Sequence, residues 1–220
     1  MTYQRFQSDF DEPPISELSR ILRFNVTPDA ARRMFFSPRH EDARHYPALL
    51  ANGDTRLKSS VLSLLFLKHR KQWEFLRVFI IAGGVLQLCT LLVDPNLYAR
   101  GQAVETFLSV TDCDTYDWFN TEEDVVSHCL NFQLFSLEDS ASTFLPALFG
   151  NRSQSYPGGS YHALQIIAFW LSWMRARFTP DQRIRLHPHM FRELEAWATT
   201  ESLEENERKL ARTLLEDFKR

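Results

Sequence analysis

The chain has 220 residues, of which 44% are hydrophobic and 24% are charged, with only 7 glycines and 10 prolines. So few turn residues disfavour a fold of many short strands. The 25 basic and 28 acidic residues give a formal net charge of −3, which excludes a strongly basic surface, and we expect no nucleic acid partner.

The three cysteines are odd in number and form no CxxC pair, which disfavours a disulfide framework and a zinc knuckle. The N-terminus lacks the basic start and apolar run of a secretory signal. The segment Phe75–Val93 is apolar enough to be considered as a membrane span, but it contains Arg77, Gln87 and Gly83-Gly84. We therefore expect a cytoplasmic protein without a membrane span.

The first 40 residues predict an N-terminal helical cap or degenerate repeat. A helix is expected over Ile15–Phe24, and Thr27-Pro28-Asp29 is typical of a helix start. Proline suits the first helical position because the amide hydrogen it lacks would have no partner there.

A pattern of small and apolar residues recurs after 43 residues, where Ser59–Leu65 realigns with Gln102–Leu108. A short helix and a turn precede each copy. The short helices are Tyr46–Ala51 and Val85–Val93, and Asp54 or Thr55 is expected to cap the first long helix. A period in the forties is typical of a helical solenoid.

A third, looser copy places a short helix at Ala141–Phe149 and a long helix at Tyr161–Phe178. The polar loop at 150–160 between them is long, and such insertions often carry function.

The C-terminal part, from Thr179, is polar and helical. Ser202-Leu203-Glu204-Glu205 matches a capping box. The following helix carries an apolar stripe made of Leu203, Leu210, Leu214 and Phe218. This stripe predicts a capping element that covers the last apolar face of the helical stack.

The segment Phe79–Leu92, with Ala82-Gly83-Gly84 inside it, followed by Arg100–Leu108, resembles an armadillo repeat. In that family the first helix ends at an Ala-Gly-Gly, the second carries paired leucines and the third begins near a Gln-Ala. The glycines suit a junction where two helices meet at a steep angle, because a side chain there would clash or need a forbidden backbone angle.

The resemblance implies an all-α fold: a short right-handed α-solenoid of about three armadillo-like repeats with capping helices at both ends. The repeats would span about 41–69, 70–112 and 121–178, between caps at 1–40 and 179–220. HEAT repeats and an unrelated helical bundle are the alternatives.

In such a solenoid the third helices line a concave groove that receives a peptide or a partner helix. The matching positions here are Lys58, Leu62, Phe66, Glu105, Ser109, Gln165, Phe169 and Trp173. Family members that carry nuclear import cargo place tryptophan and asparagine on these helices, so the apolar residues here suit an amphipathic helix or a folded partner instead. Core packing is the more common role of apolar residues on a helix, and it is weighed against the groove position for Leu62, Phe66 and Phe169. The same holds for the tryptophans, Trp173 included.

We find no phosphate-binding loop, nucleophile elbow or metalloprotease motif, so we expect no catalytic residue, metal or cofactor. His40 and His45 are interpreted as surface residues, and His187-Pro188-His189 as a helix start. Two charged runs are interpreted as solvated segments, the acidic Asp112–Asp117 with Glu123 and the basic Lys68–Lys71.

The sequence therefore predicts a cytoplasmic, non-enzymatic adaptor or scaffold that binds a protein partner through the groove and the loop at 150–160. One alternative is a structural subunit of a larger complex. Another is a helical metal-dependent enzyme with ligands such as Asp112, Asp114 and Glu122.

Overall fold

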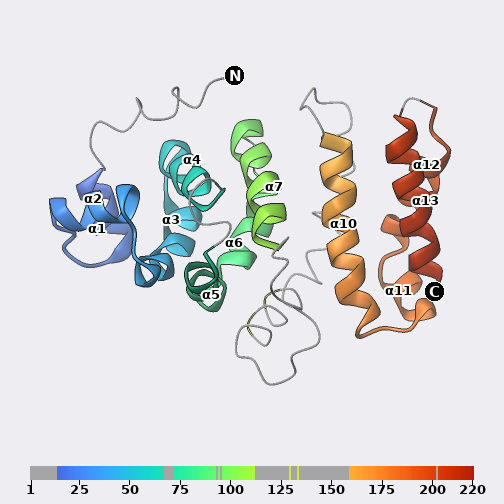
Figure 1. The fold of residues 1–220 in the computed structure, drawn as a ribbon, viewed down its shortest axis with the longest axis horizontal. Helices are drawn as coiled ribbons and strands as arrows, with labels where there is room; N and C mark the ends of the chain where they lie inside the picture. The colour runs from blue at the N-terminus through green and yellow to red at the C-terminus, as the bar shows by residue number, and fades with distance from the viewer. Residues whose placement is uncertain are drawn as a thin grey trace.

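The computed structural model describes residues 14–66, 72–92, 94, 96–111, 129, 133, 159–201 and 203–220. Every regular element among these residues is a helix, and the helices follow one another along the long axis of the molecule (Figure 1). The predicted all-α class is confirmed for this part of the chain. The count and boundaries of the repeats stay predictions.

The first two helices begin and end where local sequence signals place them. Helix α1 (Ile15–Leu22) ends at Arg23, which adopts a left-handed φ of 60°. Helix α2 (Pro28–Phe36) has Pro28 at its first position, and the Thr27 hydroxyl accepts a hydrogen bond from the Ala30 amide at 3.2 Å. The predicted start at Thr27-Pro28 is confirmed.

A 3-10 turn, η2 (His40–His45), leads into α3 (Tyr46–Asn52), and a tight turn joins α3 to α4 (Thr55–Leu64). The Asp54 carboxylate caps α4 by accepting from the Leu57 amide at 2.8 Å. The short helix, turn and long helix expected here are all present.

Helices α5 (Trp73–Ile81) and α6 (Gly84–Leu91) meet at a bend of 80°. Gly83 has a φ of 91°, which side chains rarely adopt, and a Cβ on Gly84 would lie 2.3 Å from the Phe79 ring. Both effects expected of the glycine pair are present. Gly83 adopts the left-handed backbone angle of the turn, and Gly84 leaves room for Phe79 of α5.

The side chain of Gln133, from a distant part of the sequence, hydrogen-bonds to both helices at the bend. Its amide nitrogen donates to the Ile80 carbonyl at 2.6 Å, and its amide oxygen accepts from the Leu86 backbone amide at 3.1 Å. The Ile80 carbonyl also accepts from the Gly83 amide at 2.9 Å, whereas amides in the first turn of a helix, such as that of Leu86, have no partner within the helix. The buried Gln133 side chain therefore links the end of α5 to the start of α6.

The long helices α4, α7 (Leu97–Thr111) and α10 (Gly159–Arg175) lie side by side, with α7 in contact with both others (Figure 1). Between α4 and α7, the Gln102 amide donates to the Ser63 hydroxyl at 3.2 Å. The Thr106 hydroxyl donates to the Leu62 carbonyl at 3.3 Å. The two segments that realign in the sequence are thus packed directly against each other.

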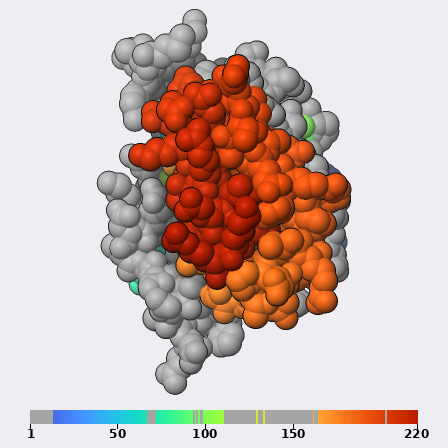
Figure 2. Space-filling model, turned by 90° about the vertical axis from the view of Figure 1, so that its right-hand side faces the viewer, coloured from blue at the N-terminus to red at the C-terminus, as the bar shows by residue number. Residues whose placement is uncertain are grey.

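Three helices complete the structure and form the end face seen in Figure 2: α11 (Pro180–Leu186), α12 (Pro188–Thr199) and α13 (Glu205–Lys219). The cap of α13 is Glu204, whose amide donates to the Glu207 carboxylate at 3.0 Å. The expected capping box thus lies two residues later than its predicted start at Ser202, which is outside the described residues. The predicted stripe is confirmed in part: Leu214 and Phe218 are buried on α13, Leu210 is half-buried, and Leu203 is buried but precedes the helix.

Within the described residues, no single helix is long and apolar enough to cross a membrane. Helices α5 and α6 reach that length and composition only together, across their 80° bend.

Several predicted features lie outside the described residues. They are the short helix Ala141–Phe149, the loop residues 150–158, the acidic run Asp112–Asp117 with Glu122 and Glu123, and the basic run Lys68–Lys71.

We expect Gly83→Ala to lower the free energy of unfolding by about 1 kcal/mol or more, because alanine disfavours a left-handed φ. Gly84→Ala should lower it by about 1–3 kcal/mol, because the added methyl group overpacks against Phe79. Urea denaturation measures both values. Gly83→Asn is the matched control, since asparagine tolerates this backbone region better, and equal losses for Gly83→Ala and Gly83→Asn would contradict the backbone explanation.

Candidate functional site

The eight predicted groove residues divide into two groups by burial. Leu62 and Trp173 are fully buried, each with 0% of its surface exposed. The other six are half-buried; they are Lys58, Phe66, Glu105, Ser109, Gln165 and Phe169.

The assignment of Leu62 and Trp173 to a groove surface is therefore corrected. Leu62 packs in the core between α4 and α7, where its carbonyl accepts from the Thr106 side chain. The Trp173 ring lies 5.0 Å from the ring of Trp170, centroid to centroid, in the core at the C-terminal end of α10. Spacing by four residues places side chains on one face of a helix, but that face is here partly turned inward.

The six half-buried residues come in pairs from the three long helices α4, α7 and α10, with Phe66 just after the end of α4. Lys58 of α4 pairs with Asp94, which precedes α7, at 3.3 Å. Phe169 of α10 packs edge-on against Phe107 of α7, with 5.5 Å between ring centroids. We call these six residues together the row surface. They include charged, amide, hydroxyl and aromatic side chains.

No family model matches the chain, and no curated protein matches its sequence.

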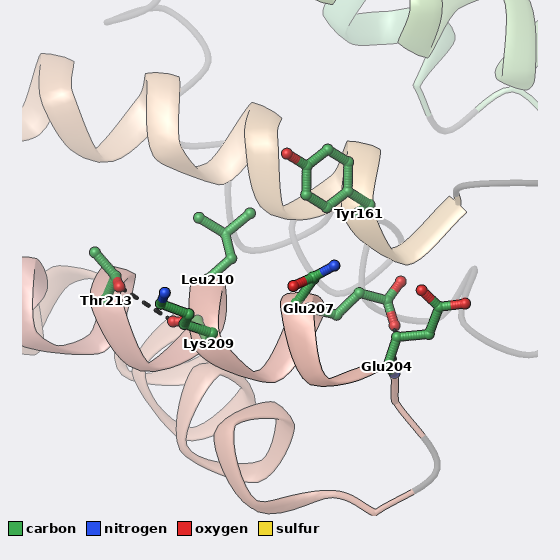
Figure 3. Close-up of a pocket in the computed structure, with 7 residues that line it drawn as sticks. Tyr161, Glu204, Glu207, Lys209, Leu210 and Thr213 are labelled. Carbon is green, nitrogen blue, oxygen red and sulfur yellow. Dashed lines mark hydrogen bonds between the residues drawn. The ribbon is translucent and has the colours of Figure 1, made fainter.

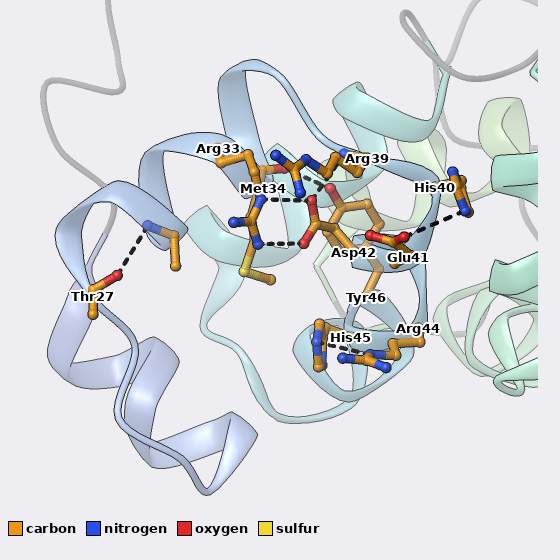
Figure 4. Close-up of polar contacts among 11 residues, drawn as sticks. Thr27, Arg33, Met34, Arg39, His40, Glu41, Asp42, Arg44, His45 and Tyr46 are labelled. Atoms are coloured by element: carbon orange, nitrogen blue, oxygen red, sulfur yellow. Dashed lines mark hydrogen bonds and ion pairs between the residues drawn. The ribbon is translucent and has the colours of Figure 1, made fainter.

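A polar cluster around Asp42 lies at the N-terminal end (Figure 4). The Asp42 carboxylate accepts from Arg33 Nη2 at 2.9 Å and Nε at 3.2 Å, and from the Arg39 amide at 2.9 Å. Burial raises the pKa of Asp42, but these donors outweigh it and hold the pKa below its usual value. The Tyr46 hydroxyl donates to the Met34 carbonyl at 2.6 Å, so the cluster joins α2 to η2 and α3.

The histidines of η2 differ from each other in exposure. His40 is exposed as expected, 3.7 Å from the Glu41 carboxylate. His45 is half-buried, with its ring 5.4 Å from that of Phe24, and burial lowers its pKa. The interpretation of His45 as a surface residue is therefore only partly right. Among the described residues, no group of three histidine, cysteine, aspartate or glutamate side chains could hold a metal ion.

An open hollow of about 620 Å³ lies between the start of α10 and α13 (Figure 3). Tyr161 from α10 faces Glu207 and Leu210 from α13 across it. Glu207 is already engaged in capping α13. The hollow brings together no acid and base that are close enough to exchange a proton, and we assign no chemistry to it.

Two polar residues of the C-terminal helices, Arg183 and His187, are buried, which the sequence did not predict. His187 ends α11 and begins α12, as expected for a helix start, and its side chain is buried with Nε2 unpaired. Its ring lies 6.5 Å from that of Trp170, and burial lowers its pKa. Arg183, one turn earlier, is also buried. Polar residues in a polar helix give no sequence signal that they face inward.

We expect Leu62→Ala to lower the free energy of unfolding by about 2–5 kcal/mol, because it leaves a cavity between α4 and α7. The matched control is Ser59→Ala on the same helix, which is half-buried and should change stability by about 0.5 kcal/mol or less. Chemical denaturation measures both. A near-neutral Leu62→Ala variant would contradict the core position.

We expect the stability of the protein to fall as the pH drops below 6.5, the ordinary pKa of histidine. The lowered pKa of His187 means that the unfolded state takes up the proton first, so the stabilisation is complete above pH 6.5 and is lost toward the lower folded-state pKa. Denaturation midpoints between pH 7.5 and 5 should decline less for His187→Leu than for wild type. His189→Leu, which changes an exposed ring, is the control and should follow the wild type.

Proposed function

We propose that the chain is a non-enzymatic adaptor or scaffold that binds a protein partner, a peptide or a helix, through the row surface. The observation that supports the proposal is the packing of α7 against both α4 and α10, since each of these three helical segments carries two half-buried residues of the predicted groove. An armadillo-like solenoid in the cytoplasm is the setting that the sequence resemblance suggests.

The chemistry of the row surface favours a partner with both apolar and polar groups. Phe66 and Phe169 offer partly exposed rings, and Glu105, Ser109 and Gln165 offer polar groups beside them. An amphipathic helix laid across packed helices buries its apolar face and keeps polar contacts at its edges. Aromatic residues at the centre of such a contact contribute most of the binding energy.

The test uses substitutions that leave the core unchanged. Ser109→Arg with Gln165→Arg adds two bulky charges to the row surface, and both positions are half-buried, so circular dichroism and the melting temperature should stay close to wild type. We expect affinity capture with the wild type to recover a defined partner that the double variant binds at least about tenfold more weakly, a loss of about 1.4 kcal/mol.

Glu195→Arg, on the exposed side of α12, is the matched control and should keep the partner. Equal capture by all three proteins would exclude the row surface as the binding site. Self-association of the chain without any other partner would favour the alternative, a structural subunit of a larger complex.

A further inference from the structure

The strongest unexplained feature is Arg183, a buried cation that lacks partners on one edge of its guanidinium group. The residue is 2% exposed, and neither Nε nor Nη2 makes a hydrogen bond. These two nitrogens form one edge of the planar group, the edge that binds carboxylate or phosphate oxygens in pairs. A buried charge is ordinarily paired, because an unpaired one is strongly destabilising.

The surroundings of Arg183 carry an excess of positive charge. Its pKa is lowered by burial and by Arg175, and Asp217 opposes this effect. The Asp217 carboxylate pairs with Arg175 at 3.4 Å, and not with Arg183. We call these three residues the Arg183 cluster. It holds two cations and one anion, contributed by α10, α11 and α13.

The exposed part of the Arg183 cluster is its ion pair. The side chains of Arg175 and Asp217 are 47% and 31% exposed, whereas Arg183 lies beneath the surface. Helices α11 and α13, which carry Arg183 and Asp217, belong to the end face in Figure 2. An ion pair this exposed is weakly held, so a stronger oxyanion can displace the Asp217 carboxylate from it.

We propose that the Arg183 cluster is an oxyanion site, in which a phosphate or carboxylate group binds the free edge of Arg183 and takes the place of Asp217 beside Arg175. Two oxygens of the anion accept hydrogen bonds from Nε and Nη2 of Arg183, so both donors gain a partner. The net charge of the cluster then falls from positive toward zero or below. The site is separate from the row surface and does not depend on the adaptor proposal.

The experiment measures thermal unfolding of the wild-type chain in increasing inorganic phosphate at constant ionic strength, with chloride as the balancing anion and acetate as a parallel series. We expect a saturable rise in melting temperature with phosphate or with acetate, and the series that saturates at lower concentration identifies the preferred oxyanion. Isothermal titration calorimetry on the same protein checks binding directly.

Arg183→Met tests the assignment, because it removes the buried charge while keeping most of the side-chain volume. The variant should melt higher than wild type without oxyanion, and its melting temperature should not respond to phosphate or acetate. Asp217→Asn removes the competing carboxylate and should lower the phosphate concentration at half-saturation. Arg185→Gln, on the exposed side of α11, is the control and should respond like the wild type.

Two results would overturn the oxyanion site. One is a wild-type protein that shows no saturable response to phosphate or to acetate, either in its melting temperature or by calorimetry. This result does not depend on any variant folding. The other is an equal response in Arg183→Met and wild type.

Discussion

The turn at Gly83-Gly84 is the constraint on which the arrangement of the central helices depends. An apolar stretch of this length would otherwise continue as one straight helix, because it contains no proline and few polar residues. A left-handed φ at Gly83 and the bare Cα of Gly84 against Phe79 instead fold it into two short helices at 80°. Both halves are then buried by contacts with other helices, α5 with η2 and α6 with α3 and α7.

The consequence of the bend is the row of long helices. Because α6 leaves the bend at a steep angle to α5, the following helix α7 lies along α4. Three contacts join α4 to the segment that contains α7: Lys58 with Asp94, Ser63 with Gln102, and Leu62 with Thr106. Those contacts decide which faces of α4 and α7 are exposed. The packing of α4 against α7 also buries Leu62, so this residue is not part of the row surface.

Two sites, one around the buried Asp42 and one around the buried Arg183, differ in how the buried charge is paired. At the N-terminal end, Arg33 meets Asp42 through two hydrogen bonds, and the pair connects neighbouring elements. At the C-terminal end, Arg183 is buried, and Asp217, the acid whose charge acts to raise its pKa, is paired with Arg175 instead. A paired buried charge holds a fold in one arrangement, whereas an unpaired one leaves binding capacity for an anion. The Asp42 site is structural for this reason. The Arg183 site is the one where a bound anion would form the most new hydrogen bonds to a buried charge.

The sequence by itself determined the helical class, the caps at Thr27 and Asp54, and the bend. Thr27-Pro28, Asp54 and Gly83-Gly84 act through their own backbone neighbourhood, so their effects could be predicted without knowing the rest of the fold. The repeated spacing of α4 and α7 could also be recognised, because it depends on residue pattern alone.

Only the tertiary structure decided which side chains face inward. Leu62 and Trp173 share a helix face with half-buried residues, and a rotation of the helix by a fraction of a turn decides their exposure. Gln133 closes a bend formed by residues 47 to 53 positions away, and Arg183 is buried by helices that are separate in the sequence. These positions depend on how helices pack against one another, and that packing is a property of the whole chain.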